Sequence, residues 1–206
     1  MDRATRDRLV GIGRRRVGGA PQHYIDVDIE ADGVAGLGSM LSIGAVTPGG
    51  HTFYRELRPV VDEYLPANRR FCEDHGLTRD RLMREAPDAD AVMAQLAEWL
   101  GQLPDADGRR PVFAAFNAAF DWAFVDLYFA RAGIENPFGI APFDLKSLAL
   151  ALDPDWDWSS TSKSRLPAWL SPDREFTHHA LEDAQYQQEI HFALAGALDH
   201  HRPERN

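Results

Sequence analysis

The sequence is poor in cysteine, in long apolar runs and in positive charge, and each shortage excludes a class of protein. The one cysteine, Cys72, cannot supply a disulfide framework or a cysteine-rich zinc cluster; this is typical of a reducing compartment, and we expect a cytoplasmic protein. No apolar run is long enough to span a bilayer, so no membrane partner is expected. The net charge of −10 over 206 residues leaves little general attraction to nucleic-acid phosphates. A protein of this charge that handled nucleic acid would have to bind a short piece of it, through metal ions.

The positive charge that the chain does have is concentrated at its N-terminus. Residues 1–22 carry six arginines and two aspartates, so the acidic excess lies in residues 23–206. We expect residues 1–22 to be a disordered basic arm, either solvated or in contact with phosphates. Residues 23–200 have the length and composition of one globular domain, and residues 201–206 are expected to be a tail.

Residues 23–33 alternate between apolar and acidic side chains, which is the period of a β-strand. One face of this strand would carry three acids, Asp26, Asp28 and Glu30. Carboxylates in a row repel one another and raise one another's pKa values unless a cation lies in front of them. A divalent ion with oxygen ligands would meet that need, and a solvated edge strand is the alternative.

The rest of the chain predicts an α/β fold with a mixed five-stranded sheet flanked by helices. A meander of strands is followed by strand–helix units, a pattern that places helices on the faces of a sheet. The other strands are expected at 40–46, 51–57, 112–116 and in a short segment that ends at Phe143. Helices are expected at 87–100, 118–132, 145–152 and 180–198, with irregular structure and short helical pieces over 59–86 and a polar loop over 153–165.

Two further acids, Asp121 and Asp183, fall in the first turns of predicted helices. The helix dipole alone favours acids there, so neither position indicates a site by itself. Asn117 is expected to cap the helix that holds Asp121. Ligands of such sheets gather at the ends of adjacent strands, which would bring these acids toward Asp28 and Glu30.

Three short motifs occur in order, at residues 28–30 (Asp-Ile-Glu), 117–121 (Asn-Ala-Ala-Phe-Asp) and 178–183 (His-His-Ala-Leu-Glu-Asp). They resemble the Asp-x-Glu, Asn-x-x-Phe-Asp and His-x4-Asp motifs of the DEDDh 3′–5′ exonucleases, the family of the proofreading epsilon subunit of bacterial DNA polymerase III and of oligoribonuclease. The resemblance covers roughly residues 24–196. The chain departs from the family where Ala31-Asp32-Gly33 follows the glutamate, where Phe116 precedes the asparagine, and in the additional acid Asp26.

The resemblance implies a ribonuclease H-like fold and a set of roles for the motif residues. Two Mg²⁺ or Mn²⁺ ions would be held by Asp28, Glu30, Asp121 and Asp183. His178, rather than its neighbour His179, would be the general base, and it could reach the metals only from a loop just before the last helix. The residues expected to contact the terminal nucleotides are His75, Asn117 and Phe120, with core packing as the alternative for Phe120.

The predicted function is therefore a metal-dependent 3′–5′ exonuclease that hydrolyses single-stranded DNA or RNA ends to nucleoside 5′-monophosphates. One alternative is an oligoribonuclease-like enzyme that trims RNA. Another is a non-catalytic interaction module on the same fold, which has no physical need for a cluster of like charges. Lys163 and Arg165 are candidates for phosphate contacts, whereas Trp156 and Trp158 are either loop anchors or base-stacking groups. A homo-oligomer and a polymerase partner both stay open.

Overall fold

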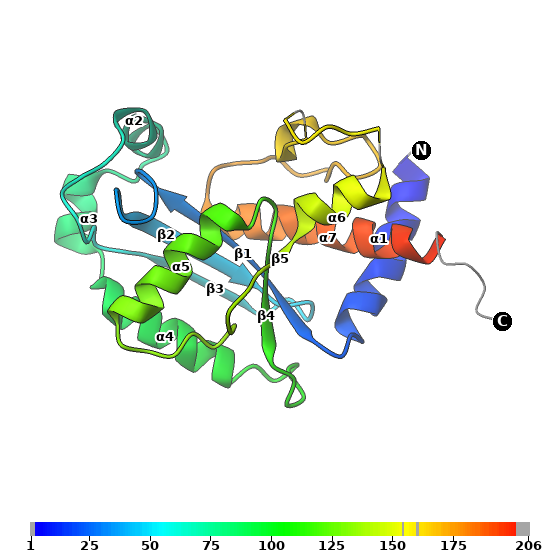
Figure 1. Ribbon diagram of the computed structural model, residues 1–206, viewed down its shortest axis with the longest axis horizontal. Coiled ribbons are helices and arrows are strands. Elements are labelled where there is room, and N and C mark those ends of the chain that lie inside the picture. The colour runs from blue at the N-terminus through cyan, green and yellow to red at the C-terminus, as the bar shows by residue number, and fades with distance from the viewer. Residues whose placement is uncertain (1–2, 154, 160, 201–206) are drawn as a thin grey trace.

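The computed structural model describes residues 3–153, 155–159 and 161–200, so the predicted tail at 201–206 lies outside the described residues. It has a five-stranded sheet in the order β3-β2-β1-β4-β5 (Figure 1). The strands are β1 (His23–Ala31), β2 (Met40–Val46), β3 (Thr52–Glu56), β4 (Pro111–Ala115) and β5 (Phe143–Asp144). The first three strands pair antiparallel, and β4 pairs parallel with both β1 and β5. The predicted mixed α/β sheet is confirmed.

Helices cover both faces of the sheet (Figure 1). They are α1 (Arg3–Gly18), α2 (Pro66–Asp74), α3 (Arg79–Glu85), α4 (Ala89–Gly101), α5 (Ala119–Arg131), α6 (Leu145–Leu152) and α7 (Ala180–His200), with a single 3₁₀ turn η1 (Lys163–Arg165). The stretch 59–86, expected to be irregular with short helical pieces, thus contains α2 and α3. None of the described helices combines the length and the apolar character that a membrane span requires.

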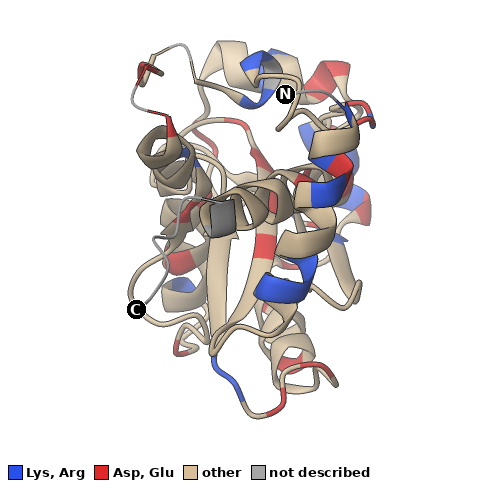
Figure 2. Ribbon diagram, turned by 90° about the vertical axis from the view of Figure 1, so that its right-hand side faces the viewer, with Lys and Arg blue, Asp and Glu red and all other residues tan. Residues whose placement is uncertain are grey.

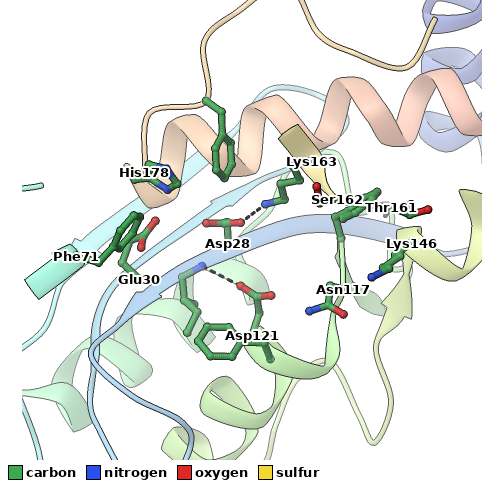
Figure 3. A pocket seen from close by; sticks show the side chains of 14 residues that line it. Asp28, Glu30, Phe71, Asn117, Asp121, Lys146, Thr161, Ser162, Lys163 and His178 are labelled. Atoms are coloured by element: carbon green, nitrogen blue, oxygen red, sulfur yellow. Dashed lines mark hydrogen bonds and ion pairs between the residues drawn. The ribbon is translucent and has the colours of Figure 1, made fainter. Parts of the chain in front are cut away.

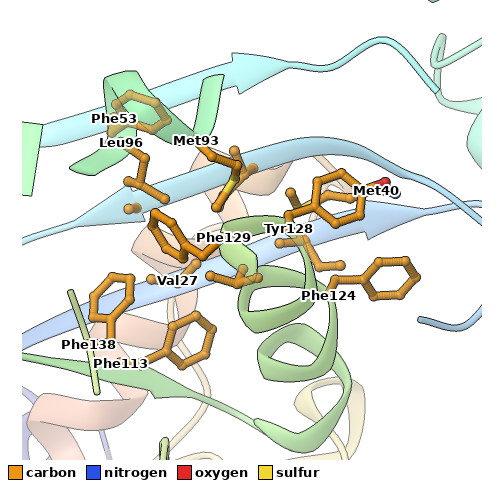
Figure 4. Packing of buried hydrophobic residues seen from close by; sticks show 14 of the residues in the cluster. Val27, Met40, Phe53, Met93, Leu96, Phe113, Phe124, Tyr128, Phe129 and Phe138 are labelled. Atoms are coloured by element: carbon orange, nitrogen blue, oxygen red, sulfur yellow. Dashed lines mark hydrogen bonds between the residues drawn. The ribbon is translucent and has the colours of Figure 1, made fainter. Parts of the chain in front are cut away.

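The alternation of β1 divides the molecule into an apolar and a polar side. Ile25, Val27 and Ile29 point toward α4 and α5 and are buried in the main core. That core is dominated by aromatic side chains from β4 and α5, with smaller groups from α4 between them (Figure 4). This layer buries the apolar face of β1 completely. The acidic face of the same strand points the opposite way and is covered by α7.

Helix α7 approaches the acidic face closely because the sheet has a glycine at the point of contact. Gly44 on β2 is paired with Asp28 on β1, and a Cβ atom at Gly44 would lie 2.3 Å from the backbone of Ala180. Any larger residue would push the first turn of α7 away from the strands. The position of Asp183 in that turn therefore depends on Gly44.

Gln187 fills the gap that opens between β1 and β4. The two strands pair only as far as Asp26 and Ala114, and beyond that point they diverge. The side chain of Gln187 donates to the carbonyl oxygens of Val27 (2.7 Å) and Ala114 (3.2 Å) and accepts from the amide of Phe116 (3.0 Å). Buried backbone groups that lose their ladder partners need others, and one side chain supplies three of those bonds.

The prediction of a disordered N-terminal arm is wrong, because α1 packs along α7. Leu9 and Val17 are buried, and the guanidinium of Arg6, 5% exposed, bonds Asp173 at 3.0 Å and Glu189 at 2.5 Å. The basic residues of the segment are thus used in part to pair with acids of the domain. Leu9, Gly13 and Val17 lie four residues apart and form one narrow contact face. So narrow an apolar face is hard to recognise as a helix pattern in a segment that contains so many charged residues.

We predict that Gly13→Ala destabilises the protein while Gly11→Ala does not. A Cβ atom at Gly13 would lie 1.7 Å from the carbonyl oxygen of Phe192 on α7, whereas no described residue lies within 4 Å of a Cβ at Gly11. Overpacking at Gly13 should cost at least about 1–3 kcal/mol of unfolding free energy. At Gly11, the same substitution should stabilise the helix by about 0.5–1 kcal/mol. Urea unfolding of both variants measures this, and equal stability of the two would mean that α1 does not pack on α7.

Candidate active site

A cavity of about 360 Å³ opens where β1 and β4 diverge, at the carboxyl end of β1 (Figure 3). Asp28 and Glu30 reach it from β1, and Asp121 reaches it from the first turn of α5. Asp183, in the first turn of α7, does not line the cavity but lies next to Glu30 and His178. The structure therefore brings together all four acids that the motifs singled out, and each is at most 9% exposed.

Backbone amides hold two of these carboxylates in place. The amide of Ile29 donates to Asp121 Oδ1 at 3.1 Å, and the amide of Thr177 donates to Asp183 Oδ1 at 3.0 Å. Asp183 Oδ2 is buried and has no hydrogen-bond partner among the described residues. A buried carboxylate oxygen without a partner costs free energy, and a cation would satisfy it.

The acids cannot all be ionised without added positive charge. Burial, followed by the charge of Asp28, raises the pKa of Glu30 to about 9. The same two causes raise the pKa of Asp121 to about 8 and that of Asp183 to about 6. Glu30, His178 and Asp183 each offer a ligand atom within 4.8 Å of one another. Oxygen-rich, buried and short of positive charge, the cluster fits a divalent cation.

Lys163 is a cation that lies among these acids. Its ammonium group forms an ion pair with Asp28 Oδ1, and the side chain is 12% exposed (Figure 3). Burial alone would lower the pKa of Lys163, but the charges of Asp28 and Asp121 outweigh it and raise the pKa above its ordinary value. The sequence suggested Lys163 as a phosphate contact, and it gave no indication of this carboxylate partner.

His178 lies just before α7, in a left-handed backbone conformation with φ of 60°. Its ring is enclosed by Phe71, His75 and Phe176, with ring centroids 4.6, 4.8 and 4.6 Å away. Burial and the neighbouring His75 lower the pKa of His178, which favours a neutral imidazole. His179 has another environment, because its ring stacks on Tyr54 at 4.3 Å. His178 thus occupies the loop position that its predicted role requires.

The predicted nucleotide contacts are placed in different ways. Asn117 and Phe120 line the cavity, and Phe120 is 36% exposed while also meeting Phe124 edge-on at 5.4 Å. His75 packs against His178, and its Nδ1 lies 2.8 Å from the carbonyl oxygen of Phe71. Asn117 does not cap helix α5. The backbone of Asn117 is left-handed, with φ of 65°, and its side chain makes no capping bond.

Several cavity residues could not be recognised in the sequence. Phe71 comes from α2, in the stretch expected to be irregular, and Phe176 and Lys146 belong to no motif. Among the loop residues, Trp156 is partly buried beside Trp169, whereas Trp158 is 54% exposed under the ammonium group of Lys146 at 4.1 Å. Nothing in their spacing distinguishes these side chains from ordinary core or surface residues.

Asp26, the additional acid, does not face the cluster. Its carboxylate is fully buried and accepts from His191 Nδ1 on α7 at 3.1 Å. Asp183 and His191 are eight residues apart on α7, so the same helix face meets both ends of the acidic strand. Asp26 is therefore a buried pairing residue of the sheet and stands apart from the predicted metal ligands.

Nucleases are among the solved structures that share the fold of this chain. The nuclease domain of 3′hExo, a DEDDh family member solved with rAMP, superposes with a TM-score of 0.62 at 13% identity, covering 86% of this chain and 92% of that one. Exonuclease I of E. coli, solved with a 5cy-dT13 oligonucleotide, gives a TM-score of 0.58 at 16% identity over 88% of this chain and 41% of that one. Fold and sequence motifs together define a 3′–5′ exonuclease of the DEDDh class with a ribonuclease H-like fold.

The particular family follows from the sequence. Residues 23–194 match the model of the 3′–5′ exoribonuclease Rv2179c-like domain, and the chain belongs to that family. A curated relative, the 3′–5′ DNA exonuclease Cap18 of Escherichia coli, is 35% identical over 170 residues, which cover 81% of this chain and 88% of the relative.

We predict that the metal-free protein loses stability as the pH rises. The folded state keeps a proton on Glu30 up to about pH 9, whereas the unfolded chain releases it near the ordinary value of 4.5. Unfolding between these two values releases a proton, so the unfolding free energy must fall as the pH rises through that window. Urea unfolding in chelator from about pH 5 to about pH 9 should show this fall, and Glu30→Gln should make it shallower, with the remaining slope due to Asp121 and Asp183. The matched control is Glu135→Gln, at an exposed position that does not line the cavity. An equal pH dependence in the two variants would contradict the assignment of the effect to Glu30.

Proposed function

We propose that this chain hydrolyses single-stranded DNA from its 3′ end and releases nucleoside 5′-monophosphates. The observation that carries the proposal is the convergence of Asp28, Glu30, Asp121 and His178 around one cavity, with Asp183 beside Glu30 and His178. The DNA relative Cap18 supports deoxyribose as the sugar. The family description names ribonuclease activity, and RNA cleavage is therefore the outcome against which the DNA proposal is tested.

The four carboxylates would hold two divalent ions, Mg²⁺ or Mn²⁺. Their fit to such ions rests on their burial, on the raised pKa values, and on the unpartnered Asp183 Oδ2. When bound, the ions would neutralise charge on the phosphodiester and lower the pKa of the attacking water. Asp28, Glu30 and Asp121 face the same cavity, so their carboxylates would be available to the ions (Figure 3).

His178 accepts the proton of the attacking water on one of its ring nitrogens. Its lowered pKa leaves the imidazole neutral near pH 7, as a general base must be. The aromatic rings of Phe71 and Phe176 restrict the ring to an orientation toward Glu30 and Asp183. Attack at phosphorus then breaks the bond to the preceding 3′-oxygen, which leaves a shorter strand and a nucleoside 5′-monophosphate.

Two aromatic side chains, Phe71 and Phe120, line the cavity at its opening and are 39% and 36% exposed. A base stacked on an aromatic ring gains about 1–3 kcal/mol, largely without regard to sequence. Asn117, exposed beside Phe120, has amide groups that can bond to a sugar or a base. His75 acts by holding the ring of His178 in place.

A non-catalytic role for this chain would leave the cluster without a physical reason. Replacing Glu30 or Asp121 by a neutral residue would remove a carboxyl group that is buried beside the charge of Asp28, an unfavourable position that the raised pKa values of both groups reflect. A scaffold that kept them would be less stable than its neutral variants. The cluster is the kind of destabilising arrangement that active sites contain.

The test of the function compares substrates that differ in one property. With Mg²⁺ or Mn²⁺, single-stranded DNA labelled at its 5′ end should be shortened stepwise, and a 3′-phosphate should block the reaction while a 5′ block should not. Activity should vanish in chelator, and metal should raise the melting temperature because it binds the folded state. Faster cleavage of RNA of the same sequence would replace DNA by RNA in the proposal. Cleavage of a closed circular strand would contradict an exonuclease.

We predict that His178→Ala loses about 10²–10⁴-fold in turnover, the range for a general base. This variant should also lose the rise of activity with pH, because the group that titrates has been removed; since the pKa of His178 is lowered from its ordinary value of 6.5, that rise lies below neutral pH, and turnover is followed from acidic pH upward. The matched control is the adjacent His179→Ala, whose ring stacks on Tyr54 instead of facing the acids, and which should stay within about tenfold of wild type. Turnover at saturating Mg²⁺ over this pH range measures both variants, and the opposite ranking would mean that His179 is the base.

A further inference from the structure

A lysine occupies the centre of a cluster that should hold metal ions. Lys163 belongs to η1, and its ammonium group pairs with Asp28 Oδ1, an oxygen of a proposed metal ligand (Figure 3). The side chain is largely buried, and its ammonium also lies 5.3 Å from the ring of Phe176. In the absence of metal, this contact neutralises one of the clustered carboxylates.

The contact and the metal compete for the same carboxylate. An ammonium that donates to Asp28 Oδ1 occupies a lone pair of that oxygen. A divalent ion bound to the same oxygen would lie close to the ammonium, and the two positive charges would repel each other strongly. A divalent ion bound at Oδ1 therefore favours the departure of Lys163 from Asp28. Its four-carbon stem gives the ammonium several ångströms of travel without movement of the backbone.

The displaced ammonium would stay in the cavity that receives the nucleic acid. Lys163 lines the same cavity as the acids, in which the phosphates of the strand would lie. A compact ammonium on a flexible stem binds a phosphate oxygen as a point charge. Once the clustered carboxylates are bound to metal, a substrate phosphate is the anion that arrives beside Lys163.

We infer that Lys163 is an exchangeable counter-ion, which neutralises Asp28 in the metal-free protein and pairs with a phosphate of the nucleic acid once a divalent ion has taken that carboxylate. This rests on the proposed function of the site. It makes metal and nucleotide bind cooperatively, because each favours the position of Lys163 that the other requires. Such coupling is reciprocal by thermodynamic necessity.

The first test measures Mn²⁺ binding to the full chain without nucleic acid, by titration calorimetry. Lys163→Met keeps the apolar stem and removes the competing charge, so Mn²⁺ should bind about 5–150-fold more tightly, the usual range of a coupling between two sites. Lys163→Arg keeps the charge and should not gain this affinity. Lys163→Gln repeats the comparison if circular dichroism shows that the methionine variant does not fold.

Lys146→Met is the matched control. Lys146 lines the same cavity and is similarly buried, but its ammonium lies over the ring of Trp158, and Figure 3 shows it beside Asn117 instead of beside Asp28. It reports the effect of removing a positive charge from the cavity in general. Equal Mn²⁺ affinities in Lys163→Met and Lys146→Met would overturn the inference, whereas failure of the wild-type chain to bind Mn²⁺ would contradict the proposed function itself.

The second test uses thymidine 5′-monophosphate, the product of the proposed reaction, as the ligand. Saturating Mn²⁺ should strengthen the binding of this nucleotide to the wild type by a larger factor than its binding to Lys163→Met. The variant has no ammonium that could move from Asp28 to the phosphate. An equal gain in the two proteins would show that Lys163 leaves Asp28 without binding the phosphate, and would overturn that half of the inference.

Discussion

The structure depends on the burial of one acidic strand face under a helix. Carboxylates are rarely buried without a partner, because desolvation costs several kcal/mol for an isolated charge. In this chain the apolar face of β1 is needed for the main core, so its alternate residues must face α7. Figure 2 shows the charged positions of the chain, with acids on the strands as well as on the surrounding helices. The elements around the site supply the groups that make that burial possible.

The cost of burial is met differently along β1. At its start, Asp26 has a permanent partner in His191 and is part of the fold. In the middle, Asp28 pairs with the ammonium of Lys163, and at the end the pKa of Glu30 is raised to about 9 by burial and by Asp28. The strand therefore passes from a fully compensated acid to acids that need an added cation. This gradient separates the structural part of β1 from its functional part.

The separation of β1 and β4 creates the room for the site. Their pairing stops at Asp26 and Ala114, and Gln187 supplies the bonds that the backbone then lacks. Beyond Gln187, the amide of Ile29 turns to Asp121 and fixes the start of α5 against β1. A site at the carboxyl ends of neighbouring parallel strands is the general rule for such sheets. Here the rule has a specific cause, which is the substitution of side-chain bonds for ladder bonds.

The sequence predicted the features that depend on period and motif, and it missed those that depend on packing between distant segments. The alternation of β1 could be read from local spacing. The four acids and the loop position of His178 followed from the resemblance of three motifs, each of which lies within one strand or one turn. Phe71, Lys163 beside Asp28, and α1 could not be predicted in this way. Their partners lie far away in the chain, and contacts such as that of Gly13 with Phe192 depend on shape and leave no periodic signal.

Helix α7 connects the stability of the fold with the geometry of the site. One of its faces carries Asp183, Gln187 and His191 against the sheet, and another packs on α1 through Gly196, where a Cβ atom would lie 2.1 Å from the carbonyl oxygen of Leu9. A helix held on two sides can keep a polar face buried, because displacement toward solvent would also break its apolar contacts. The N-terminal helix thus stabilises an arrangement that repulsion among the carboxylates opposes. Its contribution to the active site is mechanical: it keeps the first turn of α7 against Gly44, and so keeps Asp183 within reach of Glu30 and His178.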